Sequence, residues 1–353
     1  MSVTMSRSYP LARAAFLAAA GAGGAAVDTY EHPLTGPEGE PLGIDVASLG
    51  PADASTVVLV FSATHGVEGY CGSALQTHWL GNFAGQRPGD VRVVNIHALN
   101  PFGMAWVRRA NEDNVDLNRN FVDWSQPAPH NSEYDGIATD VVPTEWTPEE
   151  QQRTLLALLA LVTEWGYPKM QAVVSGGQYA HPKGVFYGGS GPVWSHRWLR
   201  EWCVANLTAA RRVIIIDLHT GLGPWGHGEL ISSSVPGEPL FDRAAAIWPD
   251  LISMMSGDSV SAPLAGDWLA IAAELAPHAE VTPICIEYGT VDGVSVLQSL
   301  RADAWLHGYG DPTAPAAATV RDQVRAAFAD DNPAWIETCW TRFQEVLSAA
   351  LTS

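Results

Sequence analysis

The sequence has few charged residues, and few of these are positive. Charged side chains make up 16% of the 353 residues, and 38 acidic residues outnumber 19 lysines and arginines, which gives a net charge of −19. Such an acidic surface repels phosphate backbones and anionic lipid, so we expect neither nucleic-acid nor membrane partners. The sequence also lacks the run of about 20 apolar residues that spans a membrane. Hydrophobic residues nevertheless make up 47% of the chain, which is ample for a large core.

Cysteine is scarce too. The four cysteines are scattered without C-x-x-C spacing, which predicts reduced, buried thiols in a cytoplasmic protein. The N-terminus allows a second interpretation, because residues 11–26 are rich in alanine and follow Arg7, as in a secretory signal. However, Arg13 interrupts this run and strongly hydrophobic residues are few in it. We therefore favour an amphipathic first helix that ends at the glycines of residues 21–24.

Several motifs of well-known catalytic sites are absent. The chain has no G-x-S-x-G elbow, no H-E-x-x-H pair and no G-x-x-x-x-G-K-[ST] loop. Residues 221–226 match G-x-G-x-x-G after a predicted strand, but Pro224 and the residues beyond do not open a helix. A pyrophosphate would then find no helix N-terminus, so we do not predict dinucleotide binding.

Apolar, β-branched strands alternate with helical segments along the chain, which is typical of a largely parallel sheet. We predict an α/β fold with a mixed, largely parallel twisted sheet and helices on both faces. Since no repeat or linker divides the chain, residues 1–353 are predicted to form a single domain. Strands are predicted at residues 43–46, 57–62, 91–98, 213–219, 229–234 and 281–290, and helices at residues 11–20, 71–80, 148–165, 194–207, 240–248, 264–275 and in three pieces after residue 294.

Three of the predicted buried strands end in side chains that can bind metal. His65 and Glu68 follow one strand in a glycine-flanked turn, and His219 ends another. Ligands of open α/β sheets bind beyond the carboxyl ends of the strands. Two imidazoles and a carboxylate, with a fourth position left to water, form the ligand set of a catalytic zinc site. Glu287, at the end of the third strand, is the predicted acceptor of the water's proton. By themselves, His65 and Glu68 are equally consistent with an ordinary surface loop.

Residues 100–123 are dense in Arg, Asn and Asp side chains. Apolar residues, among them Val115, Leu117 and Phe121, alternate with these polar ones. This pattern predicts a loop that is anchored by its apolar side chains while its polar side chains converge on a site.

Together these residues resemble the zinc carboxypeptidase (M14-type) superfamily. The shared pattern is H-x-x-E at His65 and Glu68, R-x-N at residues 109–111, VDLNRNF at residues 115–121, a strand that ends in His219, and a glutamate on a late strand. The chain as a whole is similar to a bacterial branch of this superfamily, the DUF2817 group. The resemblance implies a zinc carboxypeptidase-like catalytic domain with one Zn²⁺ per chain.

The resemblance also implies roles for individual residues. Asp116 would hydrogen-bond a metal-bound imidazole and orient it. Arg109 would polarise the scissile carbonyl and stabilise the oxyanion. Asn118 and Arg119 would bind the terminal carboxylate of the substrate. Glu287 would act first as general base and then as acid.

Further substrate contacts are predicted in glycine-rich segments. The superfamily places a mobile tyrosine near the end of the substrate, and Tyr187, within residues 176–191, and Tyr288 are the candidates here. His181 and His227 lie in glycine-rich loops on either side of the predicted site, where either can contact substrate.

The functional hypothesis is a zinc-dependent hydrolase that cleaves an amide or peptide bond next to a free carboxylate. Its substrate would be a small peptide or an amino-acid conjugate. An N-acyl amino acid deacylase, resembling the aspartoacylase and succinylglutamate desuccinylase branch, would use the same metal site with a different leaving group. A non-catalytic binding module is a third interpretation, against which the presence of Glu287 and Arg109 argues. Other divalent ions are compatible with this ligand set, and the oligomeric state is left open.

Overall fold

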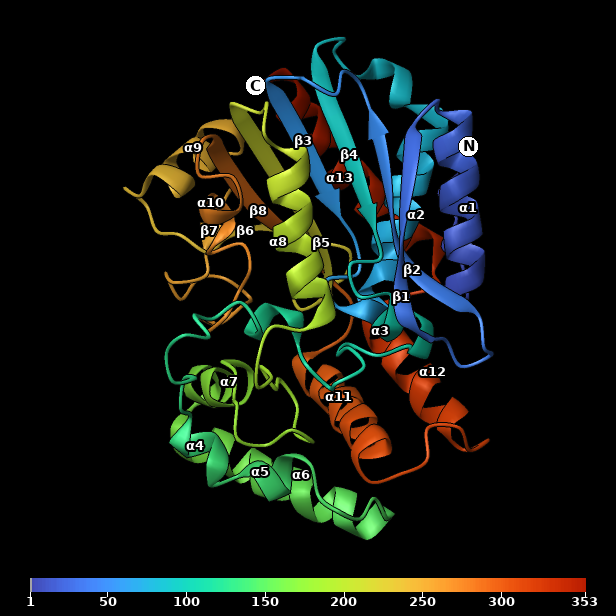
Figure 1. Cartoon of the computed structure of the whole chain (residues 1–353). Coiled ribbons are helices and arrows are strands. Elements are labelled where there is room, and N and C mark those ends of the chain that lie inside the picture. The colour runs from blue at the N-terminus through green and yellow to red at the C-terminus, as the bar shows by residue number, and fades with distance from the viewer. Residues whose placement is uncertain (1) are drawn as a thin grey trace.

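The computed structural model describes residues 2–353, and a twisted sheet forms its centre. The strands are β1 (Ala26–Thr35), β2 (Pro41–Leu49), β3 (Thr56–Phe61), β4 (Val91–His97), β5 (Arg212–Gly221), β6 (Gly228–Ser232), β7 (Ile252–Ser253) and β8 (Glu280–Gly289). Within the described residues they form one eight-stranded sheet in the order β1-β2-β4-β3-β5-β8-β6-β7. The central strands β4, β3, β5 and β8 are parallel, whereas β2 and β6 pair antiparallel with β4 and β8. The predicted mixed, largely parallel sheet is confirmed (Figure 1).

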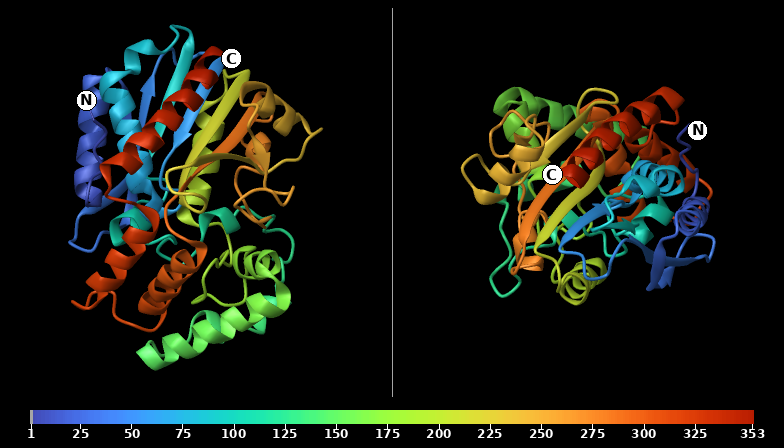
Figure 2. Two further views of the ribbon diagram at one scale, coloured as in Figure 1. Left: turned by 180° about the vertical axis from the view of Figure 1, so that it is seen from behind. Right: turned by 90° about the horizontal axis from the view of Figure 1, so that it is seen from above.

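Helices cover both faces of the sheet and the end where the parallel strands stop (Figures 1 and 2). One face carries α1 (Tyr9–Ala22), α2 (Gly69–Asn82), α9 (Pro239–Ile247) and α13 (Pro333–Thr352), and the other carries α8 (Trp194–Asn206) and α10 (Ala272–Leu275). At the strand ends lie α3 (Pro101–Trp106), α4 (Ser132–Asp135), α5 (Ala138–Val141), α6 (Pro148–Trp165), α7 (Tyr167–Ser175), α11 (Gly293–Gly308) and α12 (Ala317–Phe328). None of the helices described for residues 2–353 has the length and apolar character needed to cross a bilayer.

The central strands are apolar on both sides because both faces of the sheet are covered. In β3, Val58 and Val60 join the core under α1, α2, α9 and α13, while Val57 and Leu59 join the core under α8 and α10. Successive side chains of a strand point to opposite faces. An uninterrupted β-branched run is therefore the correct signature of a strand buried on both sides.

Two predicted segments differ from the structure. The sequence predicts only a short strand at residues 43–46 in this region, but residues 32–50 contain the end of β1 and all of β2. The side chains of β1, an edge strand, are almost all exposed, so the strand carries little apolar signal. The helix predicted over residues 264–275 exists only as α10. Gly266 adopts a φ of +83°, and its carbonyl accepts a hydrogen bond from the Phe121 amide, so this segment follows a loop conformation.

Candidate metal and active site

His65 and Glu68 reach the end of the sheet through a tight turn. Strand β3 ends at Phe61, and a 3₁₀ turn over Gly66–Glu68 leads directly into α2. A Cβ atom on Gly66 would lie 2.0 Å from the carbonyl carbon of Gly103, and one on Gly69 would lie 2.4 Å from the Cβ of Ala63. Glycine is required at both positions because the backbone passes this close to its neighbours.

His219 and Glu287 come from the adjacent strands β5 and β8. They are direct partners in the parallel register of these strands, at the carboxyl ends. Asp217, two residues before His219, points to the same face of the sheet because the side-chain period of a strand is two. The register therefore brings a histidine and two carboxylates of distant sequence position to the same edge.

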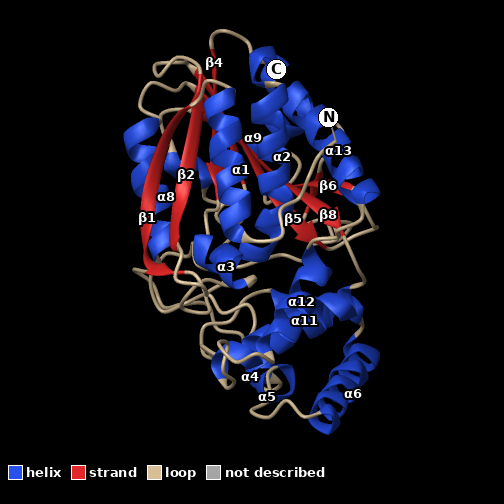
Figure 3. Ribbon diagram, turned by 90° about the vertical axis from the view of Figure 1, so that its right-hand side faces the viewer, coloured by secondary structure: helices blue, strands red, loops and turns tan. Residues whose placement is uncertain are grey.

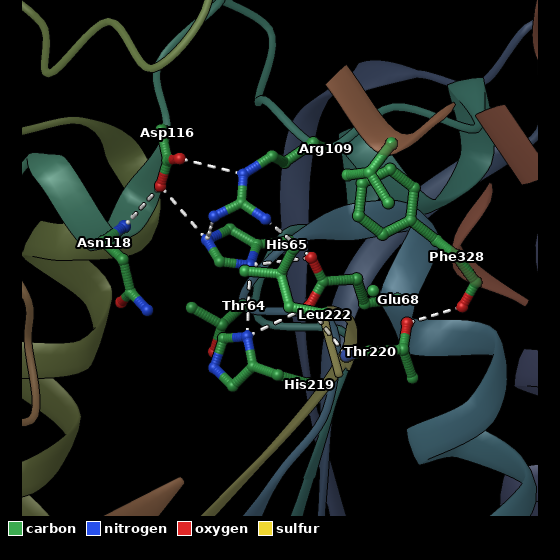
Figure 4. Close-up of polar contacts among 12 residues, drawn as sticks. Thr64, His65, Glu68, Arg109, Asp116, Asn118, His219, Thr220, Leu222 and Phe328 are labelled. Atoms are coloured by element: carbon green, nitrogen blue, oxygen red, sulfur yellow. Dashed lines mark hydrogen bonds and ion pairs between the residues drawn. The ribbon is translucent and has the colours of Figure 1, made fainter. Parts of the chain in front are cut away.

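Three side chains, those of His65, Glu68 and His219, converge at this edge (Figure 4). The Nδ1 atoms of His65 and His219 are 3.1 Å apart. The Nδ1 of His65 lies 3.0 Å from Oε1 of Glu68, and the Nδ1 of His219 lies 3.0 Å from Oε2 of Glu68. All three side chains are at most 3% exposed. Ligands held at about 2.0–2.1 Å from one tetrahedral ion are separated by roughly 3.3 Å, so the triangle has the size of a zinc site.

The other ring nitrogen of each histidine contacts a carboxylate. The Nε2 of His65 lies 3.1 Å from Oδ1 of Asp116, and the Nε2 of His219 lies 2.7 Å from Oδ2 of Asp217. A carboxylate only accepts hydrogen bonds, so the Asp217 contact assigns the proton of a neutral His219 ring to Nε2, whereas the Nε2 of His65 lies between Asp116 and a donor nitrogen of Arg109. The two Nδ1 atoms face each other and Glu68 across the same space, and their lone pairs face this space whenever the ring protons lie on Nε2. A divalent cation fits this arrangement of lone pairs.

Asp217 was not singled out in the sequence. It is fully buried and also accepts hydrogen bonds from Thr64 Oγ1 (2.8 Å) and Trp268 Nε1 (2.9 Å), which fix its orientation. The sequence signal was the D-x-H spacing on a buried strand, which places both side chains on one face.

Arg109 lies directly beside the cluster of His65, Glu68 and His219. Its Nε donates to Asp116 (2.9 Å), its Nη1 donates to Glu68 (2.8 Å), and its Nη2 lies 2.8 Å from the Nε2 of His65 (Figure 4). Burial opposes the charge of this guanidinium, but Asp116 and Glu68 raise the pKa of Arg109 above its ordinary value. Arg109 thus stays charged at the wall of the site.

Negative charge is concentrated around the two imidazoles. Burial alone would raise the pKa of Glu68, but in the metal-free protein the charge of a protonated His65 and the hydrogen bonds from His219 and His65 lower it below its ordinary value. Burial likewise opposes ionisation of Asp116, yet Arg109, Arg119 and His65 hold the pKa of Asp116 well below its usual range. Both carboxylates are therefore ionised at neutral pH, which favours cation binding.

Glu287 differs from these carboxylates. Burial first, and then the charge of Glu68, raise the pKa of Glu287 to about 7. Its Oε1 accepts a hydrogen bond from the Leu222 amide at 2.9 Å. A carboxyl group with a pKa near neutral pH can both take up and return a proton.

Asn118 and Arg119 are buried at the wall of the same cavity. The guanidinium of Arg119 donates to the carbonyl oxygens of Ser175 and Asn118. The ring of Phe186 lies against the guanidinium carbons of both Arg109 and Arg119, each 5.3 Å from its centroid. The contribution of Phe186 was missed because a lone aromatic residue in a glycine-rich loop carries no specific signal.

The structure places the predicted tyrosines and loop histidines away from this centre. Tyr187 packs in the core beneath α8, and Tyr288 is fully buried under the opposite face of the sheet. The Nε2 of His181 lies 2.8 Å from Asp135 near the surface, and His227 lines a shallow groove beside α13. Alternation along the strand sends Tyr288 away from the face that carries Glu287. None of the four lines the cavity that His65 and His219 border, so the role of these residues as substrate contacts stays a prediction.

A cavity of about 210 Å³ opens onto these groups. Its polar end contains His65, His219, Glu287, Arg109 and Arg119. The rest of its wall comes mainly from apolar side chains of α6, α7 and α11. The cavity therefore joins a charged end to an apolar end.

A comparison with solved structures finds chains that are similar in fold to this one at low sequence identity. The superposition with the crystal structure of thrombin activatable fibrinolysis inhibitor has a TM-score of 0.50 at 13% sequence identity. It covers 90% of this chain and 73% of the inhibitor chain. The superposition with carboxypeptidase A from Helicoverpa armigera has a TM-score of 0.49 at 14% sequence identity and covers 92% of this chain and 74% of the carboxypeptidase chain. The superposition with an aspartoacylase family protein from Mesorhizobium loti has a TM-score of 0.40 at 13% sequence identity and covers 81% of this chain and 67% of the other chain.

A family model described as "Protein of unknown function (DUF2817)" matches residues 5–342. The chain therefore belongs to this family, as its sequence pattern predicts. No curated protein matches the chain.

Proposed function

We propose that the chain is a single-domain, zinc-dependent hydrolase that cleaves an amide bond next to a free carboxylate. One observation carries the proposal: two imidazole nitrogens and the Glu68 carboxylate lie 3.0–3.1 Å apart, and both histidines line the same cavity as Glu287. The substrate class is a small peptide or an amino-acid conjugate.

His65, Glu68 and His219 would hold one Zn²⁺ per chain. The ion would supply Lewis-acid chemistry, which makes water more acidic and a carbonyl carbon more electrophilic. Asp217 keeps the proton of the His219 imidazole on Nε2 and so keeps its Nδ1 lone pair available, while Asp116 and Arg109 contact the Nε2 of His65 and orient that ring.

Glu287 accepts the proton of the attacking water and later gives a proton to the leaving nitrogen. The water oxygen bonds to the acyl carbon, the C–N bond breaks, and the products are a carboxylic acid and an amine. Arg109 uses three of its five N–H groups on Asp116, Glu68 and the edge of His65, so two remain for the carbonyl oxygen of the substrate. Arg119 and Asn118 bind the free carboxylate.

The test combines metal content with turnover. Purified protein is expected to bind one zinc ion and to hydrolyse members of a panel of dipeptides and N-acyl amino acids. Glu287→Gln should retain the ion by elemental analysis and lose kcat by about 10²–10⁴, whereas His219→Ala should lose the ion. Wild-type turnover in Glu287→Gln, or metal binding unaffected by His219→Ala, would contradict the proposal.

A further inference from the structure

The wall of the cavity beyond the charged groups is mainly apolar, and three helices contribute a large part of it. α6, α7 and α11 lie together beyond the carboxyl ends of the strands (Figures 1 and 3). Few polar side chains interrupt this part of the wall, among them Gln171, Ser175 and Gln298. The apolar lining residues that these helices contribute are Leu155, Leu158, Leu159 and Val162 of α6, Tyr167, Met170 and Val174 of α7, and Val294, Val296, Leu297 and Leu300 of α11.

Several of these apolar side chains are exposed although they line the cavity. Leu159 is 39% exposed, Val294 is 44% exposed and Tyr167 is 51% exposed, and all three belong to the same cavity wall. Single exposed hydrophobic residues are ordinary on a protein surface. Three that border one cavity next to a reactive centre instead indicate the entrance for an apolar ligand group.

The length of the apolar wall restricts the group that it fits. Leu155 and Val162 are seven residues apart on α6, which is about 10 Å at 1.5 Å per residue, and Val294 and Leu300 span about 9 Å on α11. An amino-acid side chain such as phenylalanine or leucine is shorter than this wall. An unbranched acyl chain can extend along its whole length. A cavity of about 150 Å³ with a comparable lining holds a benzene ring, so the volume here admits a larger group.

The two ends of the cavity match two different parts of one molecule. Arg109 and Arg119 lie at one end and offer guanidinium groups to a carboxylate and a carbonyl oxygen. The helical end offers mainly apolar contacts. A substrate with a carboxylate on its amine half and an unbranched chain on its acyl half is complementary to both ends at once.

Resting on the function proposed above, we infer that the substrates are N-acyl amino acids with a medium or long acyl chain, and that α6, α7 and α11 bind this chain. Transfer of each methylene from water to an apolar wall favours binding by about 0.8 kcal/mol, which is roughly fourfold. The acyl chain, and not the side chain of the amino acid, is then the main determinant of selectivity.

The experiment uses two series of amides with the zinc-loaded protein. In one series the acyl group of N-acyl alanine grows from two to ten carbons. In the other the acyl group stays acetyl while the amino acid changes from alanine to leucine to phenylalanine. We expect kcat/KM to rise about fourfold per methylene up to about eight carbons and to change much less in the second series. A flat acyl series, or a steeper response to the amino acid, would overturn the inference.

Adjacent leucines on α6 provide matched variants. Leu155→Trp fills the cavity wall and should lower the octanoyl-to-acetyl ratio of kcat/KM at least tenfold. Leu156, which is 58% exposed and does not line the cavity, is the control, and Leu156→Trp should leave that ratio unchanged. Equal ratios in the two variants would also overturn the inference.

A binding measurement separates this inference from the proposed function. If no amide is hydrolysed, the proposed function fails, and calorimetry with Glu287→Gln protein then decides the inference. Octanoate should bind at least tenfold more tightly than acetate, and Leu155→Trp should remove the difference. Equal binding of the two acids would show that the apolar wall has no role in ligand binding.

Discussion

The two ends of the cavity are built in different ways. At the edge of the sheet, the side chains of His65, Glu68, Asp217 and His219 are at most 3% exposed, and each of them contacts at least two polar partners. On α6, in contrast, only Thr154 and Leu158 are buried among 18 residues, and Leu156 and Leu159 are exposed. One end is a fixed polar network and the other is a lightly packed apolar helix.

This difference indicates that the two ends of the cavity have different functions. Groups that hold an ion or move a proton must have their geometry fixed before the substrate arrives, because reorganisation would cost rate. Apolar contacts are non-directional, so the helices that make them need no such precision. Elements with little burial also open locally at low free-energy cost. We expect changes at the sheet edge to have large effects and changes on the exposed side of α6 to have small ones.

The largest effect is expected where the two regions are joined. The Nε of Arg108, in the loop before the DLNRNF segment, donates to both oxygens of Asp303 on α11 at 3.0–3.1 Å, and both side chains are buried. Asp303→Ala leaves the guanidinium buried without its counter-ion. We expect a loss of about 3–5 kcal/mol in the free energy of unfolding, measured by urea denaturation.

An exposed ion pair in the helical region is the control for this prediction. Lys169 and Glu133 are 2.6 Å apart and about half exposed. Glu133→Ala should cost at most about 1 kcal/mol because water screens the pair. Similar losses for Glu133→Ala and Asp303→Ala would remove the contrast between the two regions.

The next effect concerns the buried carboxyl group of Glu287 at the sheet edge and its influence on stability. A carboxyl group with a folded-state pKa of about 7 favours the protonated form, so its contribution to stability is complete below its ordinary value of 4.5 and is lost as the pH rises through 7. The pKa rises from 4.5 to about 7, and each pKa unit corresponds to 1.36 kcal/mol, so the free energy of unfolding falls by about 3 kcal/mol over this pH range. Metal-free Glu287→Gln should therefore be more stable than metal-free wild type at pH 8 by about that amount.

Denaturation of the two metal-free proteins across the pH range checks this sign. The stability difference between Glu287→Gln and wild type should shrink between pH 8 and pH 5. A difference that stays constant over this range would mean that burial does not raise the pKa of Glu287.

A smaller effect is expected from the carboxylate behind His219. Asp217→Asn keeps the size of the side chain and removes the charge that fixes the imidazole proton on Nε2. Metal affinity should fall about 10–100-fold, measured by competition with a chelator. Asp267, another buried aspartate of the cavity wall that bonds to Ser233 and the Leu269 amide, offers the control. Asp267→Asn should change the affinity less, and the reverse order would reject the assignment of Asp217.

The sequence was most informative where chemistry and burial coincide. The β-branched runs of β3 and β5 and the H-x-x-E spacing predicted which side chains gather at the sheet edge, since parallel strands that end together must bring their next residues together. The register that pairs His219 with Glu287 follows from the same rule. The metal-binding and catalytic roles themselves stay predictions.

Other features could not be read from the chain. The edge strand β1 has exposed polar side chains, and its pairing with β2 depends on tertiary context. Tyr187 looked like a cavity residue because it lies in a glycine-rich loop, but its neighbour Phe186, with a φ of +54°, turns toward the arginines instead. Backbone conformation decides whether the side chain of residue 186 or that of residue 187 points into the cavity, and the spacing of residues in the sequence does not reveal this conformation.

The smallest effect is expected on the exposed face of α6. Leu156 is 58% exposed and Leu158, two residues further along, is 3% exposed. Leu156→Gln removes little buried area and should change the free energy of unfolding by less than about 0.5 kcal/mol. Leu158→Ala, on the same helix, removes buried methyl groups and should cost about 2–5 kcal/mol if its surroundings are as tightly packed as a protein core. A cost for Leu158→Ala near the lower end of this range would show that the cavity already relieves the packing around it, as expected for a wall shaped to receive a ligand. A cost near the upper end would make α6 as rigid as the sheet edge, and the contrast between the two ends of the cavity would then be one of chemistry alone.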